Sequence, residues 1–273
     1  MIADSRKFLI VFDLDGVICK PQSEGEVNYI DDPIEFHKAN LECPIPVAID
    51  YRGALYFHYF PPYLDVLFNY LISCNCRIAF FSAAIEFRNV DLLKEFLPDL
   101  LGDSRYEQLQ AEGQFAVFSN IHLTPDNKKD ISIIVNQNQN EDLNNSLLIE
   151  DQPQNAANNT SCIQVISLCA WDILSQDNTS VECLPKSNTY YLLGIFVSYF
   201  NKAMLCGVTL KEWLHSVGLD KQILNNPAFI QEMILLGLQE VQKQYPDAVH
   251  YGEEYFQPKK PKQQFSSMKL ISF

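Results

Sequence analysis

Residues 8–17 read Phe-Leu-Ile-Val-Phe-Asp-Leu-Asp-Gly-Val. The first five form a continuous apolar run, which is typical of a strand buried on both faces of a parallel sheet. The run stops at an acidic turn, so that Asp13 and Asp15 follow the end of the strand. Residues two apart in an extended turn can both face one crevice.

The same pattern occurs twice more along the chain. Residues 77–81 are Arg-Ile-Ala-Phe-Phe and end at Ser82, and residues 146–149 are Ser-Leu-Leu-Ile and end at Glu150 and Asp151. Strands that each deliver a polar residue past their carboxyl end indicate an open α/β sheet with its ligand crevice at that edge.

The segments between these strands predict the rest of the fold. Residues 62–74 and 87–97 carry apolar residues at helical spacing, as crossover helices of a doubly wound parallel sheet should. Residues 46–59 predict a β-hairpin with a turn at Gly53. We expect this hairpin to form a small β insert after the first strand, at about residues 41–60.

From about residue 187 the pattern becomes helical, with Thr209 and Asn226 as predicted N-caps. Residues 136–145 are rich in Asn and Gln and predict a solvated loop. The expected organisation is an α/β domain over 1–186, a helical C-terminal extension over 187–256 and a flexible tail over 257–273.

Composition limits the function classes. The 273 residues carry a net charge of −14, which opposes binding to nucleic acid and to anionic lipid. Eight scattered cysteines favour reduced thiols. The N-terminus does not resemble a signal peptide, and the apolar stretch 190–200 is too short to span a bilayer. We expect a soluble, cytoplasmic protein, although peripheral membrane contact stays open.

The polar residues at the strand ends suit phosphoryl transfer through a carboxylate. Asp13 is the candidate nucleophile, and Asp15 can protonate the leaving oxygen and later accept a proton from water. Ser82 can hydrogen-bond a phosphoryl oxygen, and a later lysine can neutralise the remaining charge.

A carboxylate that attacks an anionic substrate needs a hard cation to offset the repulsion. Mg2+ prefers carboxylates, a carbonyl, waters and substrate phosphate. The candidate ligands are Asp13, the backbone carbonyl of Asp15 and Asp151, with Glu150 binding directly or through water.

Together these motifs resemble the four-motif signature of the haloacid dehalogenase (HAD) superfamily. Five stretches further resemble the small C-terminal-domain phosphatases, the FCP/SCP group, in chain order; they are 44–50, 60–68, 81–84, 129–132 and 149–153. The likeness covers about residues 8–175. It implies a phosphorylated protein side chain as substrate, with phosphotyrosine and phosphoserine or phosphothreonine both open.

The resemblance also assigns individual roles. It favours Lys129 as the catalytic and substrate-binding lysine, because the family's lysine precedes a sequence like Asp-Leu-Ser, and Lys128 is the rival. Ser82 and the adjacent Ala83 belong to the motif that binds the phosphoryl group. The chain departs from the group in having Gly16-Val17 where the group usually has Glu-Thr, in having Glu150-Asp151 where the group often has Asp-Asn, and in a longer Asn/Gln loop.

Other interpretations stay open. The motif at residues 13–17 also occurs in sugar-phosphate phosphatases and phosphomutases of the superfamily, but those usually carry a helical lid where this chain is β-patterned. A non-catalytic binding module on the same fold is a second alternative. The Asn-, Gln- and Lys-rich composition also resembles bacterial effector phosphatases of the HAD type, which would imply delivery into a host cell.

Four aromatic residues of the predicted insert have two interpretations. They could line a phosphopeptide pocket over the crevice, or they could pack inside the insert. These residues are Tyr56, Phe57, Tyr59 and Phe60.

Overall fold

The computed structural model describes residues 8–23, 43–51, 53–135, 141–168, 183–219 and 226–248. The predicted tail at 257–273 and residues 136–140 of the predicted Asn/Gln loop lie outside these ranges.

A five-stranded parallel sheet forms the centre of the molecule, in the order β6-β5-β1-β7-β8. All five side chains of β1 are buried, which explains its unbroken apolar sequence. The three strands predicted from the sequence are β1, β5 and β7. The strands are β1 (Phe8–Phe12), β5 (Cys76–Phe81), β6 (Phe115–Phe118), β7 (Ser146–Glu150) and β8 (Cys162–Gln164).

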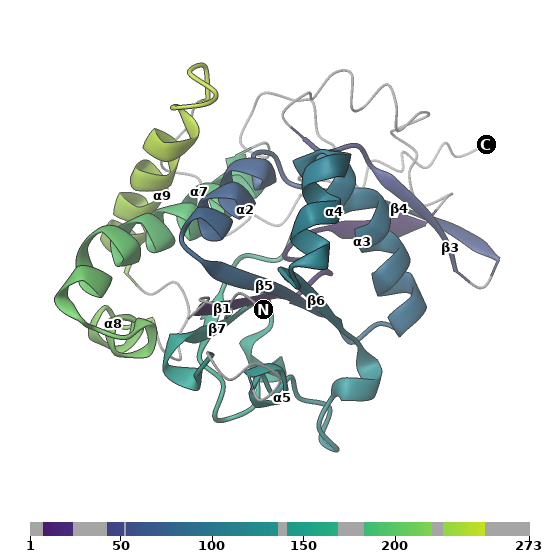
Figure 1. Ribbon diagram of the computed structural model, residues 1–273, viewed down its shortest axis with the longest axis horizontal. Coiled ribbons are helices and arrows are strands. Elements are labelled where there is room, and N and C mark those ends of the chain that lie inside the picture. Colours follow the sequence, from purple (N-terminus) through teal and green to yellow (C-terminus); the bar gives the residue numbers. More distant parts are fainter. Residues whose placement is uncertain are drawn as a thin grey trace, which may run out of the picture.

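Helices cover both faces of this sheet (Figure 1). On one face lie α2 (Leu64–Ser73), α3 (Glu86–Leu101) and α4 (Asp103–Ala111), and on the other lies the short α5 (Ser132–Val135). Alternate residues of β1 enter the two cores, because Ile10 faces the larger and Val11 the smaller. The predicted α/β class with a doubly wound parallel sheet is confirmed.

The insert after β1 is a second sheet of three antiparallel strands, ordered β2-β4-β3. The predicted hairpin corresponds to β3 (Val47–Tyr51) and β4 (Ala54–Tyr59), and Gly53 in its turn has φ +77°. The added edge strand β2 (Lys20–Ser23) has the sequence Lys-Pro-Gln-Ser, which carries no apolar alternation. Its pairing depends on backbone bonds with β4, so the sequence pattern gave no sign of it.

The C-terminal helices pack on the sheet domain rather than standing apart (Figure 1). They are α7 (Cys183–Ser198), which continues in a π turn at Tyr199–Ala203, α8 (Leu210–Ser216) and α9 (Pro227–Val241). The rings of Tyr199 and Phe200 meet Phe8 of β1 edge to face, and the Thr189 hydroxyl donates to the Pro62 carbonyl at 3.0 Å. The extension therefore shares the larger core with the sheet.

Glycine allows α7 and α9 to cross at backbone contact. A Cβ atom on Gly194 would lie 1.7 Å from the Met233 carbonyl oxygen, and one on Gly237 would lie 1.9 Å from the Tyr190 oxygen. The predicted N-caps are confirmed, because the Thr209 side chain accepts from the Glu212 amide and the Asn226 side chain accepts from the Phe229 amide.

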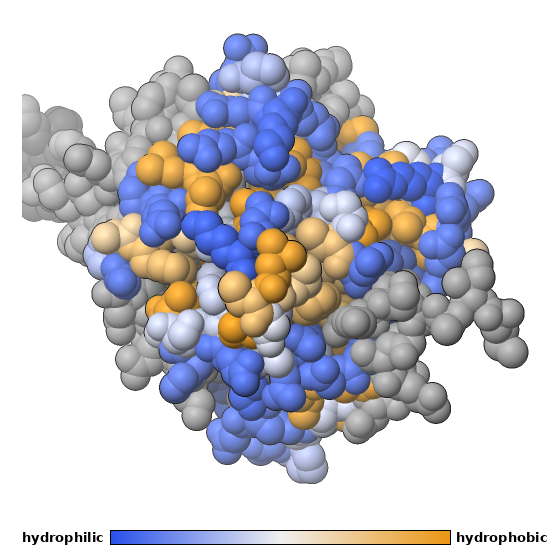
Figure 2. Space-filling model, turned by 60° about the vertical axis from the view of Figure 1, so that its left-hand side comes forward, coloured by the Kyte–Doolittle hydropathy of each residue, from blue (hydrophilic) through white to orange (hydrophobic). Residues whose placement is uncertain are grey.

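Among the described residues, no single helix has the length and apolar character needed to cross a bilayer. The segments Asn188–Cys206 and Leu210–Ser216 reach that length and composition only as a pair bent by 109°. Figure 2 turns the side with α8 and α9 forward, and on this face hydrophobic residues lie in small groups separated by hydrophilic ones.

Candidate active site

The site forms where three neighbouring strands end at the same edge of the sheet. Asp13 follows β1, Ser82 follows β5, and Glu150 and Asp151 lie at the end of β7. The Asp13 amide donates to the Ile149 carbonyl at 2.9 Å, and this bond holds the end of β1 against β7. Parallel strands present their carboxyl ends together, so residues far apart in the chain meet here.

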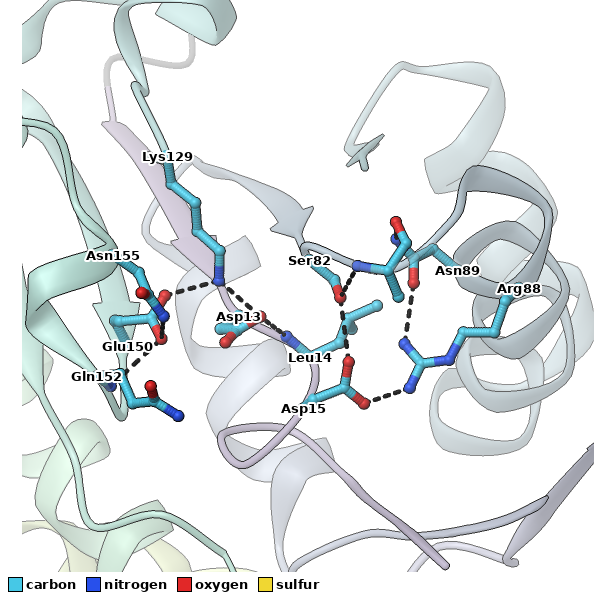
Figure 3. A network of polar contacts seen from close by, with 11 residues as sticks. Asp13, Leu14, Asp15, Ser82, Arg88, Asn89, Lys129, Glu150, Gln152 and Asn155 are labelled. Atoms are coloured by element: carbon cyan, nitrogen blue, oxygen red, sulfur yellow. Dashed lines mark hydrogen bonds and ion pairs between the residues drawn. The ribbon is translucent and has the colours of Figure 1, made fainter. Parts of the chain in front are cut away.

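Lys129 lies between two of these carboxylates (Figure 3). Its Nζ is 2.8 Å from Asp13 Oδ1 and 2.6 Å from Glu150 Oε2, and its side chain is 2% exposed. The backbone holds it there, because its amide donates to the Asn155 carbonyl and its carbonyl accepts from Ala157. The ammonium of Lys128 instead donates to the Gln154 carbonyl. The structure thus brings Lys129 into the site and not its rival.

Three buried carboxylates face this single lysine. One ligand oxygen from each of Asp13, Glu150 and Asp151 lies within 4.8 Å of the others. Burial raises the pKa of Asp13 well above its ordinary value near 3.8, and the charge of Glu150 adds to the rise, although Lys129 opposes it. Burial and Glu150 also raise the pKa of Asp151, although a hydrogen bond from Ser167 opposes this. Three carboxylic acid groups thus share the positive charge of one lysine side chain.

Such a cluster suits a hard divalent cation, since buried oxygen ligands and uncompensated charge are what Mg2+ needs. Asp13, Glu150 and Asp151 can hold a metal ion here. The side chain of Asp15 contacts Ser82 and Arg88 instead. The metal ligand predicted from the sequence is the backbone carbonyl of Asp15, and that assignment stays a prediction.

Gly16 makes the close approach of Asp151 possible. It has φ +86°, and a Cβ atom at this position would lie 2.4 Å from Asp151 Oδ2 and 2.9 Å from Ser167 Oγ. Its carbonyl accepts from the Leu168 amide at 2.7 Å. The glycine of the acidic motif is therefore required both by backbone conformation and by space.

Asp15 and Ser82 lie on the other side of the turn (Figure 3). Ser82 Oγ donates to Asp15 Oδ2 at 3.1 Å and accepts from the Ala84 amide at 3.1 Å. The Asp15 side chain is 35% exposed, so incoming solute can reach it. Ala83 is exposed beside them, at the mouth of the site. The predicted residues thus meet in two groups, one around Lys129 and one around Asp15.

Arg88 completes the second group and was missed by the sequence analysis. Its guanidinium pairs with Asp15 Oδ1, and its other terminal nitrogen donates to Asn89 Oδ1 at 2.9 Å. Burial opposes its charge, but the neighbouring Asp15 carboxylate more than offsets this, and the pKa of Arg88 rises. A signal was present, because Arg88 stands four residues before Leu92 and eight before Phe96, on the helix face that packs against the sheet.

The arrangement can perform nucleophilic and acid-base chemistry side by side. Asp13 Oδ1 accepts from the Leu14 amide and from Lys129, both at 2.8 Å, so its carboxylate is held in one orientation. Asp15 lies two residues away with its own hydroxyl and guanidinium partners. Two carboxylates with different partners can take different roles in one reaction.

No protein-family model and no curated protein sequence matches the chain. Among solved structures, it is similar to a variant of the fission yeast RNA polymerase II CTD phosphatase Fcp1 bound to beryllium fluoride. That match has 14% identity and a TM-score of 0.42, and covers 90% of this chain and 68% of the other. A structure of Fcp1, an essential RNA polymerase II CTD phosphatase, matches with 13% identity, the same TM-score and the same coverage.

Proposed function

We propose that the protein is a Mg2+-dependent phosphoprotein phosphatase that acts through an aspartyl-phosphate on Asp13. The observation that carries the proposal is the meeting of three buried carboxylates with Lys129, beside a second, more accessible aspartate. A purely structural ion-pair cluster would balance its charges, and this one has three acids for one lysine.

Asp13, Glu150 and Asp151 would hold Mg2+, together with the Asp15 carbonyl. When bound, the cation neutralises the repulsion between the Asp13 carboxylate and the phosphate dianion. The residues present fit this ion, because three buried carboxylates meet one ammonium group and one oxygen from each lies within 4.8 Å of the others.

In the first half-reaction a carboxylate oxygen of Asp13 attacks phosphorus, and the bond from phosphorus to the leaving oxygen breaks. Asp15 gives its proton to that oxygen, so the leaving group departs as an alcohol or phenol. Ser82 and Lys129 hydrogen-bond the phosphoryl oxygens and hold the group in line. General acid help of this kind contributes about a hundred- to ten-thousand-fold in rate.

In the second half-reaction Asp15, now a carboxylate, removes a proton from water. The water oxygen attacks phosphorus, the bond to Asp13 breaks, and inorganic phosphate leaves. Asp13 is thereby regenerated as a carboxylate and Asp15 as an acid, which closes the cycle.

A protein side chain is the substrate class that the sequence resemblance implies. The open position of Asp15 and of Ala83 supports it, because the reacting groups are reachable beside a β insert. The same β insert stands in the interval where the sugar-phosphate members usually carry a helical lid.

The test is phosphate release from phosphotyrosine, phosphoserine and phosphothreonine peptides and from sugar phosphates, with Mg2+ and with EDTA. Asp13→Asn removes the nucleophile, and Asp247→Asn, at an exposed position near the C-terminal end of the described chain, removes the same charge as a matched control. We expect peptide turnover that needs Mg2+, disappears in Asp13→Asn and persists in Asp247→Asn. Turnover of sugar phosphates alone would favour the metabolite interpretation, and no Asp13-dependent turnover would favour a binding module.

A further inference from the structure

A cavity of about 360 Å³ opens beside Asp15. It lies between the β insert and the turn that follows β5, and its lining includes none of Asp13, Glu150 and Asp151. Small-molecule sites range from about 300 to 1,000 Å³, so this cavity has room for one ring-sized group.

The walls of the cavity are apolar and aromatic. Ile49 and Tyr56 are direct cross-strand partners on β3 and β4, and Tyr51 follows Ile49 by two residues, so all three side chains lie on one face of the insert. The Tyr51 and Tyr56 rings are 6.4 Å apart at an angle of 54°. Ile85 lines the cavity from the turn after β5.

The base of the cavity offers no uncompensated cation among the described residues. Arg88 lines it, but its guanidinium is paired with Asp15. Burial and the charge of Arg88 lower the pKa of His58 to about 4, so this histidine is neutral near pH 7. A second anion would find little to bind here, whereas an uncharged ring would find aromatic and aliphatic contacts.

We propose that this cavity receives the ring of phosphotyrosine, so that the enzyme prefers phosphotyrosine to phosphoserine and phosphothreonine. The inference rests on the proposed function, because it assigns the cavity to the leaving group of that reaction. The leaving oxygen must lie within hydrogen-bond reach of Asp15, so the group attached to it extends past Asp15 into the cavity. When the phosphorus–oxygen bond breaks, that oxygen takes the proton of Asp15 and tyrosine leaves as a phenol.

Serine and threonine fill this space poorly. Only one carbon separates their oxygen from the backbone, so the peptide itself would have to enter between Tyr51 and Ile85. The lining there is mostly apolar, and the two charged side chains in it, Asp15 and Arg88, are already paired with each other, so backbone amide groups would lose their hydrogen bonds to water. Tyrosine places a whole ring between oxygen and backbone and leaves the peptide at the rim. There Phe87, 53% exposed with its ring 6.1 Å from Tyr51, offers a further aromatic surface.

Three of the four aromatic residues singled out from the sequence divide between the two interpretations. Tyr56 lines the cavity. Tyr59 and Phe60 are 1% exposed, and Phe60 stacks on Phe96 in the core with ring centroids 4.1 Å apart.

The experiment compares kcat/KM for peptides that differ only in the phosphorylated residue. We expect wild type to favour phosphotyrosine over phosphoserine by about ten- to a hundredfold, the amount that burying one aromatic side chain provides. Tyr56→Ala should reduce this ratio about tenfold. Tyr106→Ala is the matched control, because Tyr106 is a half-buried tyrosine that packs on Phe115 away from the cavity, and it should keep the wild-type ratio.

A second variant guards against misfolding of Tyr56→Ala. Ile85→Trp would fill the cavity from the opposite wall and should also lower the phosphotyrosine to phosphoserine ratio. An equal loss on both peptides in these variants, or a wild type that prefers phosphoserine, would overturn the inference.

Acetyl phosphate separates this outcome from failure of the proposed function, because it carries no ring and reports on phosphoryl transfer itself. If acetyl phosphate is turned over, this turnover is lost in Asp13→Asn, and the wild type shows no preference for phosphotyrosine, the proposed phosphatase activity is supported. The proposal that the cavity receives the phosphotyrosine ring is then refuted. Absence of Asp13-dependent turnover on acetyl phosphate and on every peptide would refute the proposed function.

Discussion

Replacing Gly16 by alanine should separate the fold from the metal site. The new Cβ atom would stand 2.4 Å from Asp151 Oδ2, where ordinary contact begins at 3.4 Å, so the carboxylate or the turn must move by about 1 Å. The position also has φ +86°, which alanine adopts only at a cost.

The two costs can be estimated separately. A left-handed backbone costs alanine about 1–2 kcal/mol, which lowers Tm by roughly 2–8 °C in a chain of this size. A misplacement of about 1 Å within a reacting site costs on the order of a hundredfold in rate. We therefore expect a modest loss of Tm and a loss of about a hundredfold in kcat/KM, together with weaker Mg2+ binding.

Gly113→Ala is the matched control. Gly113 has φ +69°, and nothing lies within 4 Å of the position its Cβ would take, so this variant incurs the backbone cost without the contact. The assay measures Tm with EDTA and with saturating Mg2+, and kcat/KM over a Mg2+ titration. Mg2+ should raise the Tm of wild type and Gly113→Ala, because a ligand that binds only the folded state stabilises it, and should raise the Tm of Gly16→Ala less.

Equal activity and equal Mg2+ midpoints in the two glycine variants would refute this reasoning. That result would mean that activity and Mg2+ binding do not depend on the observed position of the Asp151 carboxylate. The assignment of Asp151 as a metal ligand would then be wrong.

Three further predictions address the charged groups. Lys129→Met should lower kcat by about a hundred- to a thousandfold, whereas Lys128→Met should stay near wild type, and equal losses in a phosphate-release assay would contradict the assignment. Burial raises the pKa of Asp13, so between the ordinary carboxyl pKa and the raised value the folded chain keeps a proton that the unfolded chain loses, and metal-free stability falls as pH rises. The Tm of Asp13→Asn minus that of wild type in EDTA should therefore grow as the pH rises above the ordinary carboxyl pKa, and a flat difference would show that the pKa of Asp13 is not raised. Arg88→Met should lower kcat/KM about a hundredfold by releasing Asp15, and Arg88→Lys should recover part of it; unchanged kcat/KM with a lowered Tm would assign Arg88 a structural role alone.

Much of the fold followed from local pattern. Three continuous apolar runs predicted β1, β5 and β7, because a strand covered on both faces has no reason to alternate. The caps at Thr209 and Asn226 were also readable, since a side chain that bonds an amide two or three residues later acts within its own turn. The strand ends in turn predicted that Asp13, Ser82 and Asp151 share one edge.

Contacts between distant segments were not readable. The edge strand β2 pairs with β4 through backbone hydrogen bonds. Every residue except proline can both donate and accept such bonds, so they leave no pattern in the sequence. The crossing of α7 and α9 depends on Gly194 and Gly237, each of which contacts the backbone of the opposite helix. A glycine within a helical sequence pattern does not indicate which helix it will contact. Arg88 carried a charge on an apolar helix face, but its partner Asp15 is 73 residues away.

The two lysines at 128 and 129 show where the limit lies. The sequence by itself determined that a buried parallel sheet ends in carboxylates and that a cation must accompany them, because burial pattern and charge are properties of the residues. Residue type could not determine which neighbouring ammonium enters the site, since the two side chains are chemically identical, and only the family resemblance favoured Lys129. That choice belongs to the tertiary structure, in which backbone bonds from residue 129 to Asn155 and Ala157 direct Lys129 toward Asp13 and Glu150.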